Sequence, residues 1–136
     1  MQVQELKQIV IKVIDDMATD LIKVSRDIHA RPELAFEEFY AADRLCTMVE
    51  DNGLDITRNA FGLETAFVSS FGTQDEHDCE VAIISEYDAL PGIGHACGHN
   101  IIAAAGLGAT LALSKLNGKL PGRVRYLGTP AEEKGG

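Results

Sequence analysis

Two short segments concentrate the side chains that can bind a metal ion or transfer a proton. The first, EYDALPGIGHACGHN at 86–100, contains two of the four histidines and one of the three cysteines of the chain. The second, TPAEE at 129–133, ends in two adjacent glutamates. Because Asp, Glu, His and Cys are the side chains that bind Zn²⁺ and neighbouring divalent ions, the two segments predict a shared metal centre if the fold brings them together.

The spacing within each segment suits this chemistry. Cys97 and His99 flank a glycine, and in an extended backbone residues two apart point to the same side, so both could face one ion. The proline and glycines of 90–94 disfavour a helix there, which supports the extended interpretation. In the second segment, one of Glu132 and Glu133 could bind the metal while the other acts as general base on a water molecule.

Other interpretations of the same residues remain open. Cys97 and His99 could be a nucleophile and its base, which would make the protein a thiol hydrolase. The glycines between 92 and 98 resemble a dinucleotide-binding loop, but their spacing is one residue too long and no acidic residue ends the following strand. An isolated glutamate pair such as 132–133 is commonly a solvated turn, and His95 is expected to have a structural role within its loop.

Hydrophobic periodicity predicts the elements that position these segments. Apolar residues recur every three or four positions from Val3 to Ile28 and again from Leu34 to Val49, which predicts two amphipathic helices. In the acidic turn at 72–78, His77 is expected to be solvated. Two short runs in which apolar residues alternate with polar ones predict a small antiparallel pair of strands at 54–57 and 65–71.

A strand, a helix and a second strand are predicted around the two chemical segments. The continuous apolar run Val81–Ser85 predicts a strand covered on both faces. Residues 101–116 predict a buried helix capped by Asn100, and 124–127 predict the second strand. If the two strands are parallel neighbours in an α/β sheet, the segments that follow them emerge at the same edge, where such sheets place their sites.

Composition narrows the class of protein. With 136 residues and 46% hydrophobic content, we expect one domain. A net charge of −9 argues against nucleic acid or an anionic membrane surface as partner. No apolar run reaches the roughly 18 residues of a membrane span, and charged residues interrupt the first twenty, so no secretion signal is expected. Three widely spaced cysteines suit a reducing compartment, and we expect a soluble, cytoplasmic protein.

Four motifs in one order carry a resemblance to a known family. They are HARPELAFEE at 29–38, DALP at 88–91, HACGH at 95–99 and TPAEE at 129–133. Together they resemble the amidohydrolase branch of metallopeptidase family M20. Within that branch, the compressed loop with Asn100, where many members have Asp, looks most like the group of aminobenzoyl-glutamate hydrolase and peptidase M20 domain-containing protein 2.

The resemblance implies both a fold and an activity. The fold would be the N-terminal part of a zinc-peptidase-like, three-layer α/β/α catalytic domain with a mixed sheet. The activity would be hydrolysis of the amide bond of small N-acyl amino acids or dipeptides by metal-activated water. The cofactors would be two divalent ions, Zn²⁺, Mn²⁺ or Co²⁺, since a set of Cys, His and carboxylates suits each of them.

The resemblance also implies roles for individual residues. On the matching positions, Cys97, His99 and Glu133 would be metal ligands. Glu132 would be the general base, and Asp88 would orient a ligand.

The sequence departs from the family in other places. Glu86 stands where other branches have a metal-binding histidine, and Lys134 stands where glycine is usual. Family members continue through further histidine ligands and an inserted dimerisation domain. We therefore expect residues 1–136 to be an N-terminal fragment with little activity of its own, from a protein that forms homodimers. The alternative is a noncatalytic metal-binding or interaction domain.

Overall fold

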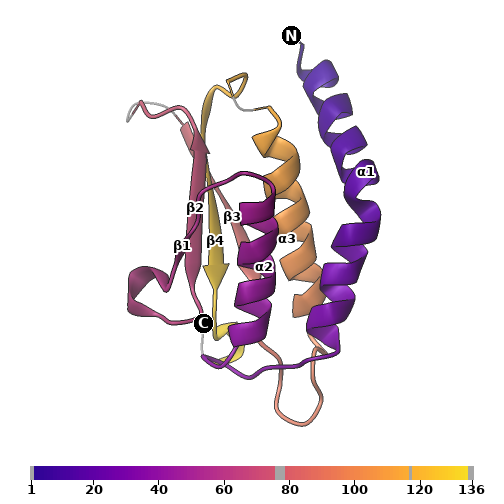
Figure 1. Cartoon of the computed structure of the whole chain (residues 1–136), viewed down its shortest axis with the longest axis vertical. Coiled ribbons are helices and arrows are strands. Elements are labelled where there is room, and N and C mark those ends of the chain that lie inside the picture. The colour runs from indigo at the N-terminus through magenta and orange to yellow at the C-terminus, as the bar shows by residue number, and fades with distance from the viewer. Residues whose placement is uncertain (1, 76–78, 117, 135–136) are drawn as a thin grey trace.

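A four-stranded sheet with helices against one face forms the structure (Figure 1). The computed structural model describes residues 2–75, 79–116 and 118–134. β4 pairs antiparallel with β2 and parallel with β3, so the predicted α/β fold with a mixed sheet is confirmed. The strands lie in the order β1 (Thr57–Arg58), β2 (Phe67–Gly72), β4 (Gly122–Thr129) and β3 (Cys79–Glu86).

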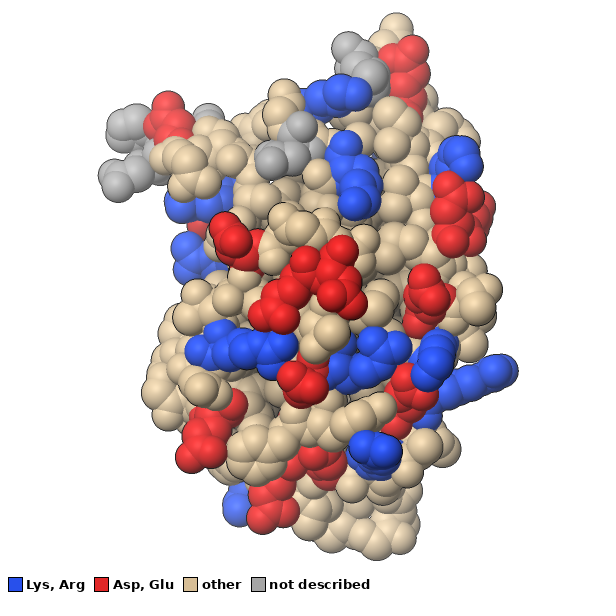
Figure 2. Space-filling view, in the orientation of Figure 1, with Lys and Arg blue, Asp and Glu red and all other residues tan. Residues whose placement is uncertain are grey.

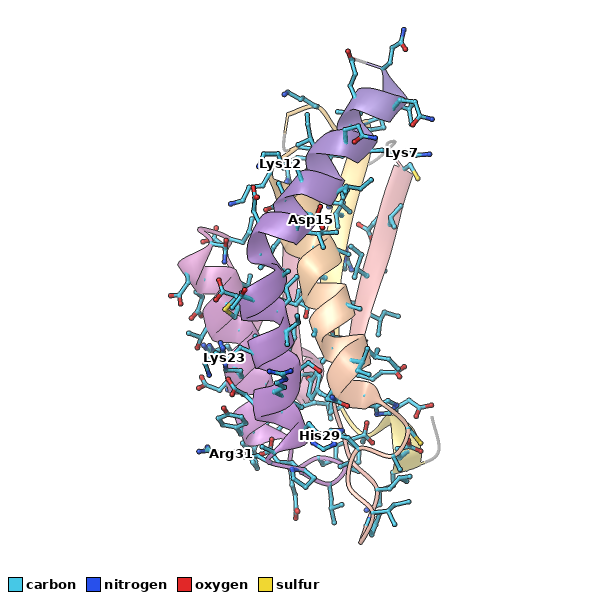
Figure 3. All side chains as sticks on the ribbon, turned by 90° about the vertical axis from the view of Figure 1, so that its right-hand side faces the viewer. Lys7, Lys12, Asp15, Lys23, His29 and Arg31 are labelled. Atoms are coloured by element: carbon cyan, nitrogen blue, oxygen red, sulfur yellow. The ribbon has the colours of Figure 1, made fainter. Side chains whose placement is uncertain are left out.

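Three helices cover one face of the sheet. α3 lies against the sheet beside α2, and α1 packs on α3 (Figure 1). Figure 3 shows α1 running along α3, with Lys7 near its far end and His29 at the end that approaches the loops after β3 and β4. The helices are α1 (Val3–His29), α2 (Phe39–Asp51) and α3 (His99–Ser114), and the short helices η1 (Ala60–Gly62) and η2 (Glu132–Lys134) complete the elements of the described residues.

The core lies between the sheet and the helices. Phe67 stacks on Tyr87 with ring centroids 5.9 Å apart and lies 5.3 Å from the ring of Tyr126, and all three are fully buried. The hydroxyl group of Tyr87 donates to the backbone carbonyl of Thr65. Because Tyr87 directly follows β3, this packing anchors the first residue of the loop that carries the site.

α3 approaches β3 closely because its inner face is made of small residues. A Cβ atom at Gly106 would collide with the hydroxyl oxygen of Ser85. That hydroxyl lies 3.0 Å from the carbonyl of Ala103 and 2.8 Å from the hydroxyl of Tyr126. The contact sets how closely α3 packs on β3. It therefore also fixes the position of His99, the first residue of α3, relative to the end of the strand.

The second helix begins later than its periodicity predicted. α2 starts at Phe39, and the segment from Leu34 is a loop in which Phe36 has a φ of 66°. The carboxylate of Glu33 accepts the backbone N–H groups of Tyr40 and Ala41, each at 2.9 Å. Glu33 thus satisfies free amides of the first helical turn from outside the helix, and the chain folds back before α2 begins.

The start of α3 also differs from the prediction that Asn100 caps it. Gly98, with a φ of 77°, is the N-cap, and its carbonyl accepts the N–H groups of Ile101 and Ile102 at 2.9 and 3.1 Å. Asn100 lies inside the first turn and its side-chain amide donates to the hydroxyl of Ser25 at 3.0 Å. The residue predicted as a cap therefore joins α3 to α1.

The prediction that β3 is covered on both faces is wrong for the described part of the chain. β3 lies at the edge of the sheet, and Ile84, which points to the face opposite its core-packed neighbour Ile83, is 49% exposed. The physical reason is that the helices occupy one face of the sheet only (Figure 1).

His77 lies outside the described residues, so its predicted solvation stays a prediction. Across 2–75, 79–116 and 118–134, none of the helices has the length and apolar character needed to cross a membrane.

Candidate metal centre

The segments that follow β3 and β4 meet at one edge of the sheet, as the parallel pairing predicted. The last residues of the two strands, Glu86 and Thr129, are partners in the ladder. Asp88, which is 1% exposed, then joins the two segments. One carboxylate oxygen lies 3.0 Å from Nδ1 of His99, and the other accepts the backbone N–H of Glu133 at 2.9 Å. A single buried carboxylate thus holds together residues from both predicted segments.

The orientation of His99 follows from this contact. Since a carboxylate accepts hydrogen bonds, Nδ1 of the neutral imidazole carries the proton and the lone pair is on Nε2. A carboxylate on one ring nitrogen is the usual support for a histidine that binds a metal through the other. His99 itself is 4% exposed, so its ring is held in place on nearly all sides.

Three carboxylates face the free nitrogen of His99. Nε2 lies 3.4 Å from a carboxylate oxygen of Glu86, 3.6 Å from one of Glu132 and 3.8 Å from one of Glu133. Ligand atoms about 2.0–2.2 Å from a common ion lie about 3.0–3.6 Å from one another. One ligand atom each from Glu86, His99 and Glu132 lie within 4.8 Å of one another, so these side chains can share an ion.

The charges at this edge also fit a cation. Elsewhere several acidic side chains have basic partners, as in the pairs Lys12–Asp16 and Lys23–Asp27, and Figure 2 shows basic side chains lying among acidic ones across the visible face. Within the described residues, neither Asp88 nor the glutamates facing His99 form an ion pair with Lys or Arg. Like charges this close repel, and a divalent ion would offset the repulsion. The donor set therefore fits a divalent metal ion.

The backbone conformation at Cys97 differs from the one predicted. The extended backbone expected through Cys97 and His99 is absent, because Cys97 lies in a turn and the positive φ of Gly98 leads directly into α3. The exposed thiol hydrogen-bonds to the side chain of Glu133, and this bond, with burial and the nearby carboxylates, raises the pKa of Cys97. Cys97 thus lies beside Glu133 but outside the group formed by Glu86, His99 and Glu132.

Glu86 is the residue at this edge that sequence analysis left without a role. Its oxygen is the nearest of the three glutamate oxygens to Nε2 of His99. A signal for it was present, because Glu86 is the last residue of a strand and therefore lies at the same edge as Asp88.

His95, predicted to be structural, is buried beside His29 with ring centroids 6.4 Å apart, and burial is the main cause that lowers its pKa.

Comparisons with known proteins identify the family of the chain. Residues 82–136 match the model of peptidase family M20/M25/M40. The chain is 40% identical over 146 residues to the Xaa-Arg dipeptidase of Mus musculus, which covers 99% of this chain and 34% of that protein. It is 31% identical to one of the subunits of the p-aminobenzoyl-glutamate hydrolase of Escherichia coli, which covers 97% of this chain and 31% of that protein.

A solved structure gives the same result. A Bacillus subtilis protein described as a dinuclear metal binding peptidase from the M20 family superposes with a TM-score of 0.79 at 28% identity, over 88% of this chain and 36% of that one. The chain spans about a third of the length of the curated relatives it matches. On the family match, the relatives and the shared fold together, the chain belongs to peptidase family M20.

Proposed function

We propose that this chain carries part of the active site of a metal-dependent amidohydrolase that cleaves the amide bond of small N-acyl amino acids or dipeptides. The observation that carries the proposal is the double contact of Asp88, which holds both the imidazole of His99 and the backbone of Glu133. The named relatives, a dipeptidase and an aminobenzoyl-glutamate hydrolase, support an amide substrate.

In this proposal the chain's own side chains hold the metal. His99 through Nε2, Glu133 and Cys97 are the ligands, Glu86 adds a carboxylate on the other side of His99, and Asp88 keeps the proton on Nδ1. When bound, the divalent ions would polarise the amide carbonyl and lower the pKa of the attacking water. We propose further ligands from a longer protein, which forms homodimers and of which residues 1–136 are the N-terminal portion.

Glu132 is the proposed general base. Its side chain is 44% exposed, and its carboxylate oxygen lies 3.6 Å from Nε2 of His99, so it stands at the open side of the site. From there it can take a proton from the attacking water and deliver that proton to the departing amine nitrogen. Its neighbour Glu133 has its backbone fixed by Asp88, which leaves the two glutamates in distinct roles.

A small cavity beside the site suits a small substrate. It has a volume of about 270 Å³ and is lined by Leu34, Ala35, Leu90, Pro91 and Glu133, among others. Its walls are mostly apolar, and Glu37, Glu133 and Lys134 are its charged lining residues. This shape supports binding of a small acyl group or amino-acid side chain next to the reacting bond.

Two alternatives predict different behaviour. A thiol hydrolase needs a nucleophilic cysteine with a lowered pKa, whereas the hydrogen bond to Glu133 and the surrounding carboxylates raise the pKa of Cys97. A noncatalytic metal-binding or interaction domain would hold the ion but turn over no substrate. The carboxylates around Cys97 therefore argue against its action as a free thiolate nucleophile.

The test is metal content and turnover of the protein expressed from its complete reading frame. We expect about two divalent ions per chain by elemental analysis, loss of metal in Cys97→Ala and His99→Ala, and hydrolysis of N-acyl amino acids or dipeptides that a chelator abolishes. Cys79→Ala is the matched control, because Cys79 is also a free, exposed cysteine but lies at the opposite end of β3. A metal-free protein under metal-replete conditions, or turnover that survives chelation, contradicts the proposal.

A further inference from the structure

A second buried carboxylate lies behind the site. Glu38 is fully buried at the start of α2. One of its carboxylate oxygens accepts the hydroxyl of Thr65 at 2.8 Å, and the other accepts the backbone N–H of Ala131 at 2.8 Å. The second bond joins residues 93 positions apart in the sequence. Both oxygens of one buried side chain are thus used by groups from separate parts of the chain.

The amide that Glu38 holds belongs to the residue before the proposed general base. Ala131 has a φ of 63°, in the left-handed region that residues other than glycine rarely adopt, and it is 7% exposed. The next residues form the short helix η2, which begins at Glu132. Because the backbone turns at Ala131, its conformation sets the direction in which Glu132 leaves β4.

We propose that Glu38 is a positioning residue, which holds Ala131 in its left-handed conformation and thereby aims Glu132 at the site. The inference rests on the proposed function for the role of Glu132. Two donors converge on the side chain, and each is accepted by one carboxylate oxygen. A leucine offers no acceptor to either donor, whereas a glutamine could keep its oxygen toward Ala131 and donate its NH₂ group to the hydroxyl oxygen of Thr65.

The same loop supplies a matched control. Glu33 also accepts two groups with its carboxylate, but both are backbone N–H groups of α2, from Tyr40 and Ala41. Glu33→Leu therefore removes the same chemical group, five positions earlier, without touching the bond to Ala131. A difference between the two leucine variants isolates the contact with the loop of the proposed base.

The experiment measures amide exchange and kinetics in the protein expressed from its complete reading frame. In Glu38→Leu we expect hydrogen exchange at the Ala131 amide to rise at least about tenfold, and kcat to fall about 10- to 100-fold, with KM within about twofold and metal content unchanged. In Glu33→Leu we expect neither the exchange at Ala131 nor kcat to change beyond about twofold. The split between kcat and KM separates positioning from a general loss of structure.

Several outcomes overturn the inference. Unchanged exchange at Ala131 in Glu38→Leu means that the bond is not holding the loop, and a kcat no lower than that of Glu33→Leu means that the bond does not aim Glu132. If Glu38→Leu does not fold, the unmodified protein still decides, because a rapidly exchanging Ala131 amide contradicts the bond directly. Full turnover in Glu132→Gln would instead overturn the proposed function and leave the exchange result standing.

Discussion

Two regions of the sheet are built differently: the end at which β3 and β4 finish, and the face that points away from the helices. At the edge after β3 and β4, buried carboxylates bind segments that are far apart in sequence, through Asp88 to Glu133 and Glu38 to Ala131. On the outer face of the sheet, which no helix of the described residues covers, Ile84 is about half exposed. The contacts that join the candidate site residues are therefore made within the described residues, whereas the outer sheet surface is suited to contact with something further.

The largest expected effect is at the proposed base. Glu132→Gln should lower kcat by about 10² to 10⁴, because the amide cannot take a proton, while metal content stays the same. The measurement is turnover of the best N-acyl amino acid or dipeptide substrate, with elemental analysis of the same sample. Glu64→Gln, a change at another exposed glutamate outside the site, is the control, and normal turnover in Glu132→Gln would break the assignment of chemistry to this edge.

A smaller effect is expected for the residue that supports the ligands. Asp88→Asn should weaken metal binding by about 10- to 100-fold, because an asparagine cannot both orient His99 and accept the amide of Glu133 as strongly. Competition with a metal indicator measures the affinity. Unchanged affinity would show that the contact between the two segments is not needed to form the site.

The packing behind the site gives the next effect in size. Gly106→Ala should destabilise the chain by about 1–3 kcal/mol, because the added methyl meets Ser85 and the carbonyl of Ile84. Gly108→Ala is the matched control, because there the methyl meets only the flexible end of Leu21, and the better helix propensity of alanine keeps the change within about 1 kcal/mol. Urea denaturation measures both, and equal costs would contradict the close approach of α3 to β3.

The smallest effect is expected on the open face. Ile84→Lys should change the free energy of unfolding by less than about 0.5 kcal/mol, since the side chain is exposed, and should reduce self-association at high concentration. Its neighbour Ile83 packs against the core, so Ile83→Lys should destabilise the chain strongly. Light scattering and urea denaturation distinguish the two variants, and a large loss of stability in Ile84→Lys would show that the face is already covered.

Local patterns predicted the frame of the molecule well. The apolar periodicity of α1, the runs of β3 and β4 and the small residues of α3 were sufficient for the parallel unit, and the unit brought the two chemical segments to one edge. The continuous apolar run of β3 was misleading about its outer side, because such a run indicates that a strand can be buried on both faces, and the described chain supplies a cover for one.

Contacts between distant residues were not predictable in the same way. Glu38 belongs to a motif noted in the sequence, but its bond to Ala131 depends on how α2, η1 and the end of β4 pack together. Glu86 and the turn at Cys97 likewise depend on the ladder register and on where α3 begins. The candidate residues could be found from their types, whereas their mutual arrangement required the fold.

The double contact of Asp88 also couples metal binding to folding. The residues it joins lie on either side of the helical crossover, so the site cannot assemble until β3 and β4 have paired across more than thirty intervening residues. An ion that binds only the paired state draws the equilibrium toward it, by about 2.7 kcal/mol when its free concentration is 100 times its dissociation constant. Metal supply would then act on the lifetime of the folded protein as well as on its activity.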